Sequence, residues 1–137
     1  MTQPHHRKLK FIELEFEAER FECQLRAWRV LNNTEDGERF YVFCPDGEFF
    51  EDAEPLYALE LAFFSDWRSG GVSDWLTEHD QETVGFRIDH HPDIPGEHVR
   101  RTGQLKIKAP SMGGEARATE ITEITLPCVG KPTYTRI

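Results

Sequence analysis

The sequence lacks any long hydrophobic run. Hydrophobic residues make up 38% of the 137 residues, but the longest apolar stretch is only a few residues, whereas a membrane-spanning helix needs roughly 20. Residues 1–10 are polar, so the apolar core of a secretory signal is missing there as well. The sequence therefore predicts a soluble single domain over residues 1–137, without membrane association and without export by this route.

Cysteine is scarce, and the sequence motifs of common enzyme classes are missing. The three cysteines, Cys23, Cys44 and Cys128, are widely spaced and form no Cys-x-x-Cys pair, which excludes a disulfide framework or a zinc knuckle. We expect them to be buried thiols in a reducing cytoplasm. The chain also has no Gly-x-Ser-x-Gly elbow and no glycine-rich phosphate loop. These gaps predict a protein that is not an enzyme and has no cofactor.

Basic residues are outnumbered, with 16 Lys and Arg against 25 Asp and Glu, for a formal net charge of −9. A surface of that sign repels the phosphate backbone, so nucleic-acid binding is disfavoured. The same repulsion would let DNA pass without adhering. The basic residues Arg100, Lys106 and Lys108 share one face of an expected strand, and we expect them to pair with acidic neighbours across strands.

Alternation of apolar and polar residues dominates the chain, as in residues 12–16 (IELEF), and is typical of strands with one buried face. The period becomes helical only in residues 70–80, where Ser73 is the expected N-cap. The pattern predicts a mostly β protein, a β-sandwich with one mid-chain helix covering an open end or edge. About seven strands are expected, at 12–16 and 21–27 as a hairpin, then 39–43, 57–63, 83–89, 99–108 and 119–129.

One stretch has the composition of a metal site. His90 and His91 stand between two aspartates, and His79 lies one element earlier. Adjacent residues of an extended segment point to opposite sides, so only one of this pair can join a given metal, and no third ligand follows at a helical spacing. The sequence therefore predicts no metal site, and a small metal-dependent enzyme stays an alternative hypothesis.

The order of elements in the second half resembles a known family. A strand ending in Leu61-Ala62-Phe63-Phe64 is followed by the short helix 71–76, the strand 83–88, and a closing strand 120–129 that runs into Gly130-Lys131-Pro132. This order resembles the major tail tube proteins of long-tailed bacteriophages, in particular those of actinobacteriophages. Residues 32–55 would then supply the long strand-to-strand loop of that family.

The resemblance implies a structural subunit of the virion tail, assembled in the cytoplasm of the bacterial host. Its copies would form hexameric rings, with one sheet of each joined into a continuous inner β-barrel whose negative lumen conducts DNA without binding it specifically. The rings would stack through long loops and terminal arms, here residues 1–8 and 130–137. Tape-measure, tail terminator and distal tail proteins would be partners. A monomeric binding or tail-completion module is the other alternative.

Two sets of residues carry these expected roles. The acidic candidates for the lumen are Glu13, Glu15, Glu60, Glu120 and Glu123. The candidates for contacts between rings or subunits are Asn32, Asp36, Pro45, Asp46, Gly130, Lys131, Pro132 and Tyr134.

We predict that removal of residues 130–137 leaves a folded subunit with impaired ring stacking, because this segment has no strand pattern of its own. Circular dichroism would report folding, and electron microscopy would report stacking. Normal polymerisation of the truncated chain would contradict the assigned role.

Overall fold

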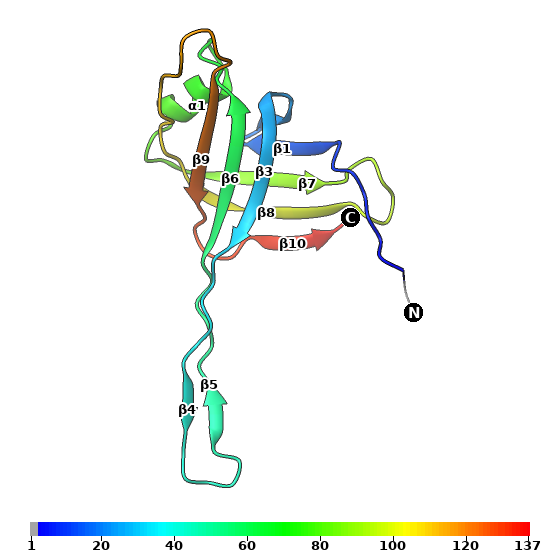
Figure 1. The fold of residues 1–137 in the computed structure, drawn as a ribbon, viewed down its shortest axis with the longest axis vertical. Helices are drawn as coiled ribbons and strands as arrows, with labels where there is room; N and C mark the ends of the chain where they lie inside the picture. The colour runs from blue at the N-terminus through cyan, green and yellow to red at the C-terminus, as the bar shows by residue number, and fades with distance from the viewer. Residues whose placement is uncertain (1–2) are drawn as a thin grey trace.

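The computed structural model describes residues 3–137, which form two packed sheets and one projecting hairpin (Figure 1). The five-stranded sheet has the order β10-β8-β7-β1-β2, the three-stranded sheet the order β3-β6-β9, and β4 pairs with β5. The elements are β1 (Ile12–Phe16), β2 (Glu19–Arg20), the 3-10 helix η1 (Glu22–Gln24), β3 (Leu25–Asn32), β4 (Arg39–Tyr41), β5 (Glu48–Phe50), β6 (Tyr57–Phe64), α1 (Val72–Glu78), β7 (Thr83–His90), β8 (Val99–Lys106), β9 (Ile121–Pro127) and β10 (Thr133–Arg136).

The strands of the two large sheets run across one another in Figure 1, so the body is an open sandwich and not a closed barrel. The mostly β sandwich with one α-helix that the sequence predicts is confirmed. All pairings between neighbouring strands are antiparallel.

The core lies between the sheets and follows from the alternation of the strands. Leu14 and Phe16 point inward from β1, and Leu59, Leu61 and Phe63 of β6 point inward from the facing sheet. The helix α1 closes one end, because its Trp75 ring stacks on Phe16 at 5.5 Å. No helix within residues 3–137 is long and apolar enough to cross a membrane. The fully buried large side chains are Phe16, Phe21, Phe63, Leu14, Leu59, Leu61, Leu76, Ile88, Leu105, Ile107, Leu126 and Val72.

The predicted hairpin between residues 12–16 and 21–27 is wrong. Glu17 and Ala18 adopt positive φ angles of 48° and 72°, so the chain turns at once into the two-residue strand β2. Phe21 then enters the core, with its ring 5.8 Å from that of Phe16. This anchor and the 3-10 turn after it redirect the chain, and β3 crosses to the other sheet to pair with β6.

The expected helix cap is also different. The N-cap of α1 is Gly71, and Ser73 lies buried in the first turn, where its hydroxyl accepts a hydrogen bond from the Asp66 N–H at 3.2 Å. A Cβ at Gly71 would lie 2.5 Å from atoms of Asp66, so only glycine fits. The N–H groups of the first turn are satisfied from outside the helix: Val72 donates to the Gln24 side-chain oxygen at 2.9 Å, and Asp74 donates to the Asp66 carbonyl at 3.3 Å.

The C-terminal segment, expected to be an arm, contributes a strand to its own subunit. Thr133–Arg136 pair with β8 as the edge strand β10, and Pro132 is buried. Gly130, with a φ of +77°, makes the turn that brings the chain back. Removing residues 130–137 would therefore also uncover the edge of β8. At the other terminus, His5 and Arg7 both contact Glu97, at 2.6 and 3.0 Å.

The cysteines are less buried than expected. Cys23 and Cys44 are exposed, because one lies in the 3-10 turn and the other in the turn of the projecting hairpin. Cys128 is half-buried, and burial raises the pKa of its thiol to about 11. This thiol is therefore protonated at neutral pH and unreactive as a nucleophile.

We predict that Leu126→Asp prevents folding, because Leu126 is fully buried and the new carboxylate would have no partner. Thr125→Asp is the matched control: it adds the same charge one residue earlier, on the exposed face of β9. Circular dichroism and thermal unfolding should show a native fold for Thr125→Asp only. A stably folded Leu126→Asp protein would contradict the position of the core.

Candidate assembly surfaces

The most unusual feature of the molecule is a hairpin arm, residues 33–55, that projects from the body as a continuation of β3 and β6 (Figure 1). Its paired section is held by β4 and β5, where the Phe40 and Phe49 rings stack at 5.4 Å. Apolar side chains are nevertheless exposed along it, and Phe43 in its turn is fully exposed. Exposed clusters of this kind mark surfaces that pack against another protein. The exposed apolar residues of the arm are Tyr41, Val42, Phe43, Phe49 and Phe50.

The arm also carries most of the net negative charge of the protein. It contains eight acidic residues and one basic residue, Arg39, so −7 of the net charge of −9 is in the arm. The body is left close to neutral. An acidic, aromatic arm therefore suits a partner surface that is apolar and positively charged.

The second assembly feature is the pair of edges of the three-stranded sheet. Within residues 3–137, β3 and β9 each pair with β6 along one side, and neither has a ladder partner on its other side. The two edges are of similar length, eight and seven residues. An edge strand presents a row of unpaired backbone N–H and C=O groups, which invites pairing with another chain.

The outer face of the five-stranded sheet is occupied by a network of ion pairs. Arg87 contacts Glu15 at 2.8 Å, Glu13 at 3.3 Å and also Asp89. Arg100 contacts Asp89 at 2.6 Å, as expected for this basic residue from the sequence. Opposite charges on neighbouring strands therefore neutralise one another across this face.

Asp89 is the buried centre of that network. Burial acts to raise the pKa of Asp89, but the hydrogen bond from Arg100 and the charge of Arg87 outweigh it, so the pKa lies below its ordinary value. The carboxylate form is thus stabilised by folding. Asp89 itself has no exposed surface. Its electrostatic contribution to the free energy of unfolding is therefore screened less by solvent than that of the exposed ion pairs.

The five predicted lumen residues separate onto different surfaces. Glu13 and Glu15 lie on the outer face of the five-stranded sheet, where arginines neutralise them. Glu60 and Glu123 lie on the outer face of the three-stranded sheet, and within residues 3–137 neither forms an ion pair within 4.0 Å. Glu120 precedes β9 and accepts a hydrogen bond from the Trp67 indole N–H. At most one of the two pairs can line a bore, and the lumen role stays a prediction.

The predicted contact residues form two groups. Asn32 ends β3 at the base of the arm, and its side-chain oxygen accepts a hydrogen bond from the Thr34 N–H at 3.2 Å. The exposed residues Asp36, Pro45 and Asp46 lie on the arm. The three arm residues are therefore placed for contacts away from the body, whereas Asn32 lines a cavity of the body.

The remaining four lie in the C-terminal segment. Lys131 is exposed, but Pro132 is buried and its carbonyl accepts a hydrogen bond from Arg101. Tyr134 lies on β10, with the Arg101 guanidinium 5.1 Å from its ring centroid. These residues therefore belong to the packing of the subunit, and whether they also meet another copy stays a prediction.

The three histidines are not brought together. The His79 ring stacks on Trp75, and its Nδ1–H donates a hydrogen bond to the Trp75 carbonyl. This contact lies at the opposite end of β7 from His90. The expectation that His90 and His91 point apart is wrong, because His91 has a φ of +52° and the two ring centroids are 4.3 Å apart. Burial and the neighbouring His91 lower the pKa of His90. Within residues 3–137, no three potential ligands gather around one point.

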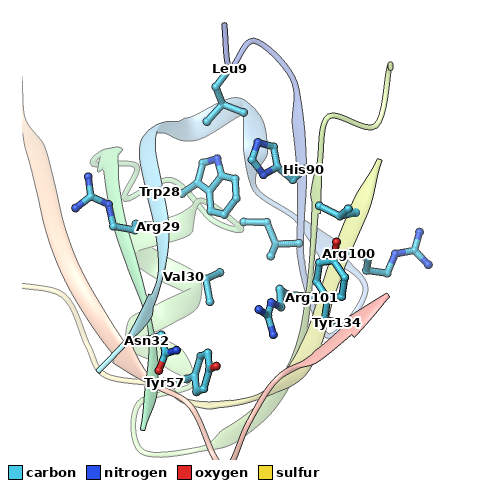
Figure 2. A pocket seen from close by; sticks show the side chains of 12 residues that line it. Leu9, Trp28, Arg29, Val30, Asn32, Tyr57, His90, Arg100, Arg101 and Tyr134 are labelled. Carbon is cyan, nitrogen blue, oxygen red and sulfur yellow. The ribbon is translucent and has the colours of Figure 1, made fainter. Parts of the chain in front are cut away.

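A cavity of about 410 Å³ opens between the sheets on the side of β3 (Figure 2). Trp28 and Val30 line it from β3, and Arg101 points into it between Tyr57 and Tyr134. Sequence reasoning did not select Arg101 or the exposed aromatic residues of the arm. For the arm, the sequence does contain an indication of an exposed contact surface, namely an aromatic strand flanked by acidic residues. For Arg101, alternation placed it on a core face, which is unusual for a charged side chain.

No family model matches the sequence, and no curated protein matches it. The fold is similar to a chain of the virion of a native gene transfer agent particle, with a TM-score of 0.65, 15% identity, and coverage of 91% of this chain and 95% of that chain. It is also similar to a chain of the tail of an empty gene transfer agent particle with C6 symmetry, with a TM-score of 0.64, 17% identity, and coverage of 91% and 94%.

This likeness extends over nearly the whole of both chains and establishes a shared fold. The chain therefore has a fold that is found in the tail of a phage-like particle. The finer resemblance, to tail tube proteins of long-tailed actinobacteriophages, stays a prediction.

We predict that the ion-pair network adds stability that disappears in acid. Because the pKa of Asp89 is lower in the folded state, its contribution is complete above the unfolded value of about 3.9 and is lost as pH falls through the folded value. Asp89→Asn should lower the free energy of unfolding by roughly 3 kcal/mol at pH 7. The difference from the unsubstituted chain should shrink below about pH 4.

Chemical denaturation at a series of pH values measures this effect. Asp93→Asn is the control, since Asp93 is exposed in the loop after β7. A loss that is the same at pH 7 and pH 3 would contradict the electrostatic origin.

Proposed function

We propose that the chain is the structural subunit of a phage-type tail tube. Its copies form hexameric rings, the rings stack into a tube, and the bore conducts DNA from the capsid to the host. The observation that carries this proposal is the likeness of nearly the whole chain to a chain of a tail with C6 symmetry. This function makes the protein a virion component without enzymatic activity.

The free edges of the three-stranded sheet support ring formation. In the part of the chain that the structure describes, a single copy leaves β3 and β9 without partners on their outer sides, and a ring of identical copies would supply both partners at every junction. Closing the sheets side by side gives a barrel and leaves no edge. The continuous inner barrel is then built from the three-stranded sheets.

The charges of the two outer faces favour the same arrangement. The five-stranded sheet carries carboxylates that form ion pairs with arginines, whereas within residues 3–137 Glu60 and Glu123 form no ion pair within 4.0 Å, and Arg29 is the cation beside Glu60. A bore that faces DNA needs polar groups without a net positive charge, so that the phosphates do not adhere. Of the predicted lumen residues, Glu60 and Glu123 are then the ones that line the bore.

The arm supports stacking. It continues β3 and β6 beyond the end of the sandwich, along the direction in which a ring would meet the next ring (Figure 1). Its exposed aromatic residues supply apolar contact area, and its acidic residues call for a basic acceptor. Residues 3–11 contain Arg7, Lys8 and Lys10 and no acidic residue, which makes them one such acceptor.

Tape-measure, tail terminator and distal tail proteins are the further partners of this proposal, because other proteins must set the length of a tube and close its two ends.

Purified protein at high concentration should form rings or tubes that electron microscopy reveals. A protein that stays monomeric, even with other tail proteins present, would contradict the proposal. A defined complex with one other tail protein, without homopolymer, would instead favour a tail-completion module.

We predict that the double variant Val42→Ser with Phe43→Ser forms rings that do not stack, because it removes exposed apolar contact area from the arm while the Phe40–Phe49 stack and the sheet edges are intact. Met112→Ser is the control: Met112 is also strongly exposed but lies in the loop before β9. Sedimentation velocity should show ring-sized particles for the double variant and tubes for the control. Tubes of normal length from the double variant would rule out the arm as the stacking element.

A further inference from the structure

The strand directions determine how two copies can meet. β3 and β9 are each antiparallel to β6, so they run parallel to one another in one subunit. Rotation about the axis of a ring preserves the direction of a strand along that axis. Where β9 of one copy meets β3 of the next, the two strands must therefore run parallel. This consequence follows from the odd number of strands in the sheet.

The two edges also carry opposite charges on the same face. Arg29 lies on the outer face of β3, beside Glu60 of β6, and it points away from the cavity between the sheets (Figure 2). Glu123 lies on the outer face of β9, beside Ala62 of β6. Both Arg29 and Glu123 are exposed, and within residues 3–137 neither has an ion-pair partner within 4.0 Å. One edge thus offers a cation and the other edge a carboxylate.

The register within one sheet gives the stagger between copies that would bring the two residues together. Arg29 is level with Thr125 across β6, and Glu123 is two residues before Thr125. A stagger of two residues at the junction therefore brings Glu123 of one copy directly opposite Arg29 of the next. Closed barrels require a stagger between strands, because their strands tilt relative to the axis. A stagger of an even number of residues also keeps both side chains on the same face.

We propose that β9 of one copy pairs in parallel with β3 of a second copy, and that Glu123 and Arg29 face one another across this junction. This inference rests on the proposed function and adds the strand direction, the register and the residue pair. Parallel pairing is slightly weaker per residue than antiparallel pairing, so a charge pair at each junction adds to it.

The same charges disfavour the wrong dimers. Two copies related by a two-fold axis would pair β3 with β3 or β9 with β9, in an antiparallel manner. The first would bring together the exposed Arg26 and Arg29 of both copies, and the second would bring together Glu123 of both copies. Like charges at close distance oppose these closed dimers, so the ring is favoured.

A charge exchange tests the pair. Arg29→Glu alone and Glu123→Arg alone should each raise the protein concentration at half-maximal ring formation about tenfold, because every junction then holds two like charges. The double variant, Arg29→Glu with Glu123→Arg, should restore assembly to within about threefold of the unsubstituted chain. Sedimentation velocity measures the ring fraction, and circular dichroism confirms that each variant is folded.

Glu82→Arg is the matched control, because it reverses the same charge at an exposed position just before β7, in the other sheet and away from both junctions. It should leave ring formation within about twofold of the unsubstituted chain. Failure of the double variant to recover would overturn the residue pair. Failure of the unsubstituted chain to form any ring would instead overturn the proposed function, so the two failures are distinguishable.

Disulfide trapping tests the direction and the register. With Cys23 and Cys44 replaced by Ser, the double variant Arg29→Cys with Glu123→Cys should form covalent oligomers up to the size of the ring under oxidising conditions. Directly opposite strand residues have Cα separations that a disulfide spans. Leu31→Cys with Glu123→Cys, two residues out of register, should yield at least fivefold less product. Efficient dimers from Arg29→Cys alone would show β3 paired with β3 and overturn the proposal.

Discussion

The constraint on which the rest of the structure depends is the need of backbone N–H and C=O groups for partners. In the three-stranded sheet, β6 has strand partners on both sides, whereas among residues 3–137 β3 and β9 have a strand partner on one side only. The five-stranded sheet covers the inner face of this sheet and gives it a core, but it does not cover the edges. The subunit thus has a packed centre and open sides, and in the proposed ring identical copies would complete it.

Much of the fold could be predicted from the sequence, because period-two alternation is strong in the strands that face the core. It predicts β1, β6, β7, β8 and β9 with bounds close to those observed. It fails at residues 21–27, since the inward turn at Phe21 depends on contacts with Phe16 and Trp75. It also fails at β10, where the residues are mostly exposed and the strand exists because β8 offers an edge.

The candidate surfaces were harder to predict, for a physical reason. Alternation separates buried from exposed residues but does not say which sheet an exposed glutamate belongs to. Glu13 and Glu60 have the same local pattern, yet Glu13 forms an ion pair with Arg87, whereas Glu60 forms none within 4.0 Å in the described residues, although Arg29 is its neighbour across the strand. The partner across the strand decides the difference, and strand pairing is a property of the folded chain. In the arm, residues 39–43 were expected as a strand within a long connection, but the exposure of their side chains depends on the projection of the arm from the body (Figure 1).

The uneven distribution of charge has a consequence for polarity. The arm holds −7 of the net charge, and the remainder of the chain is nearly balanced. A ring of such subunits would present six like-charged arms on one side and none on the other. Two rings whose arm-bearing sides faced one another would repel. A ring that approached with its arm-free side toward the arms of another ring would not. Each added ring would then take the orientation of the last, so the growing filament would have one direction, set before any contact forms.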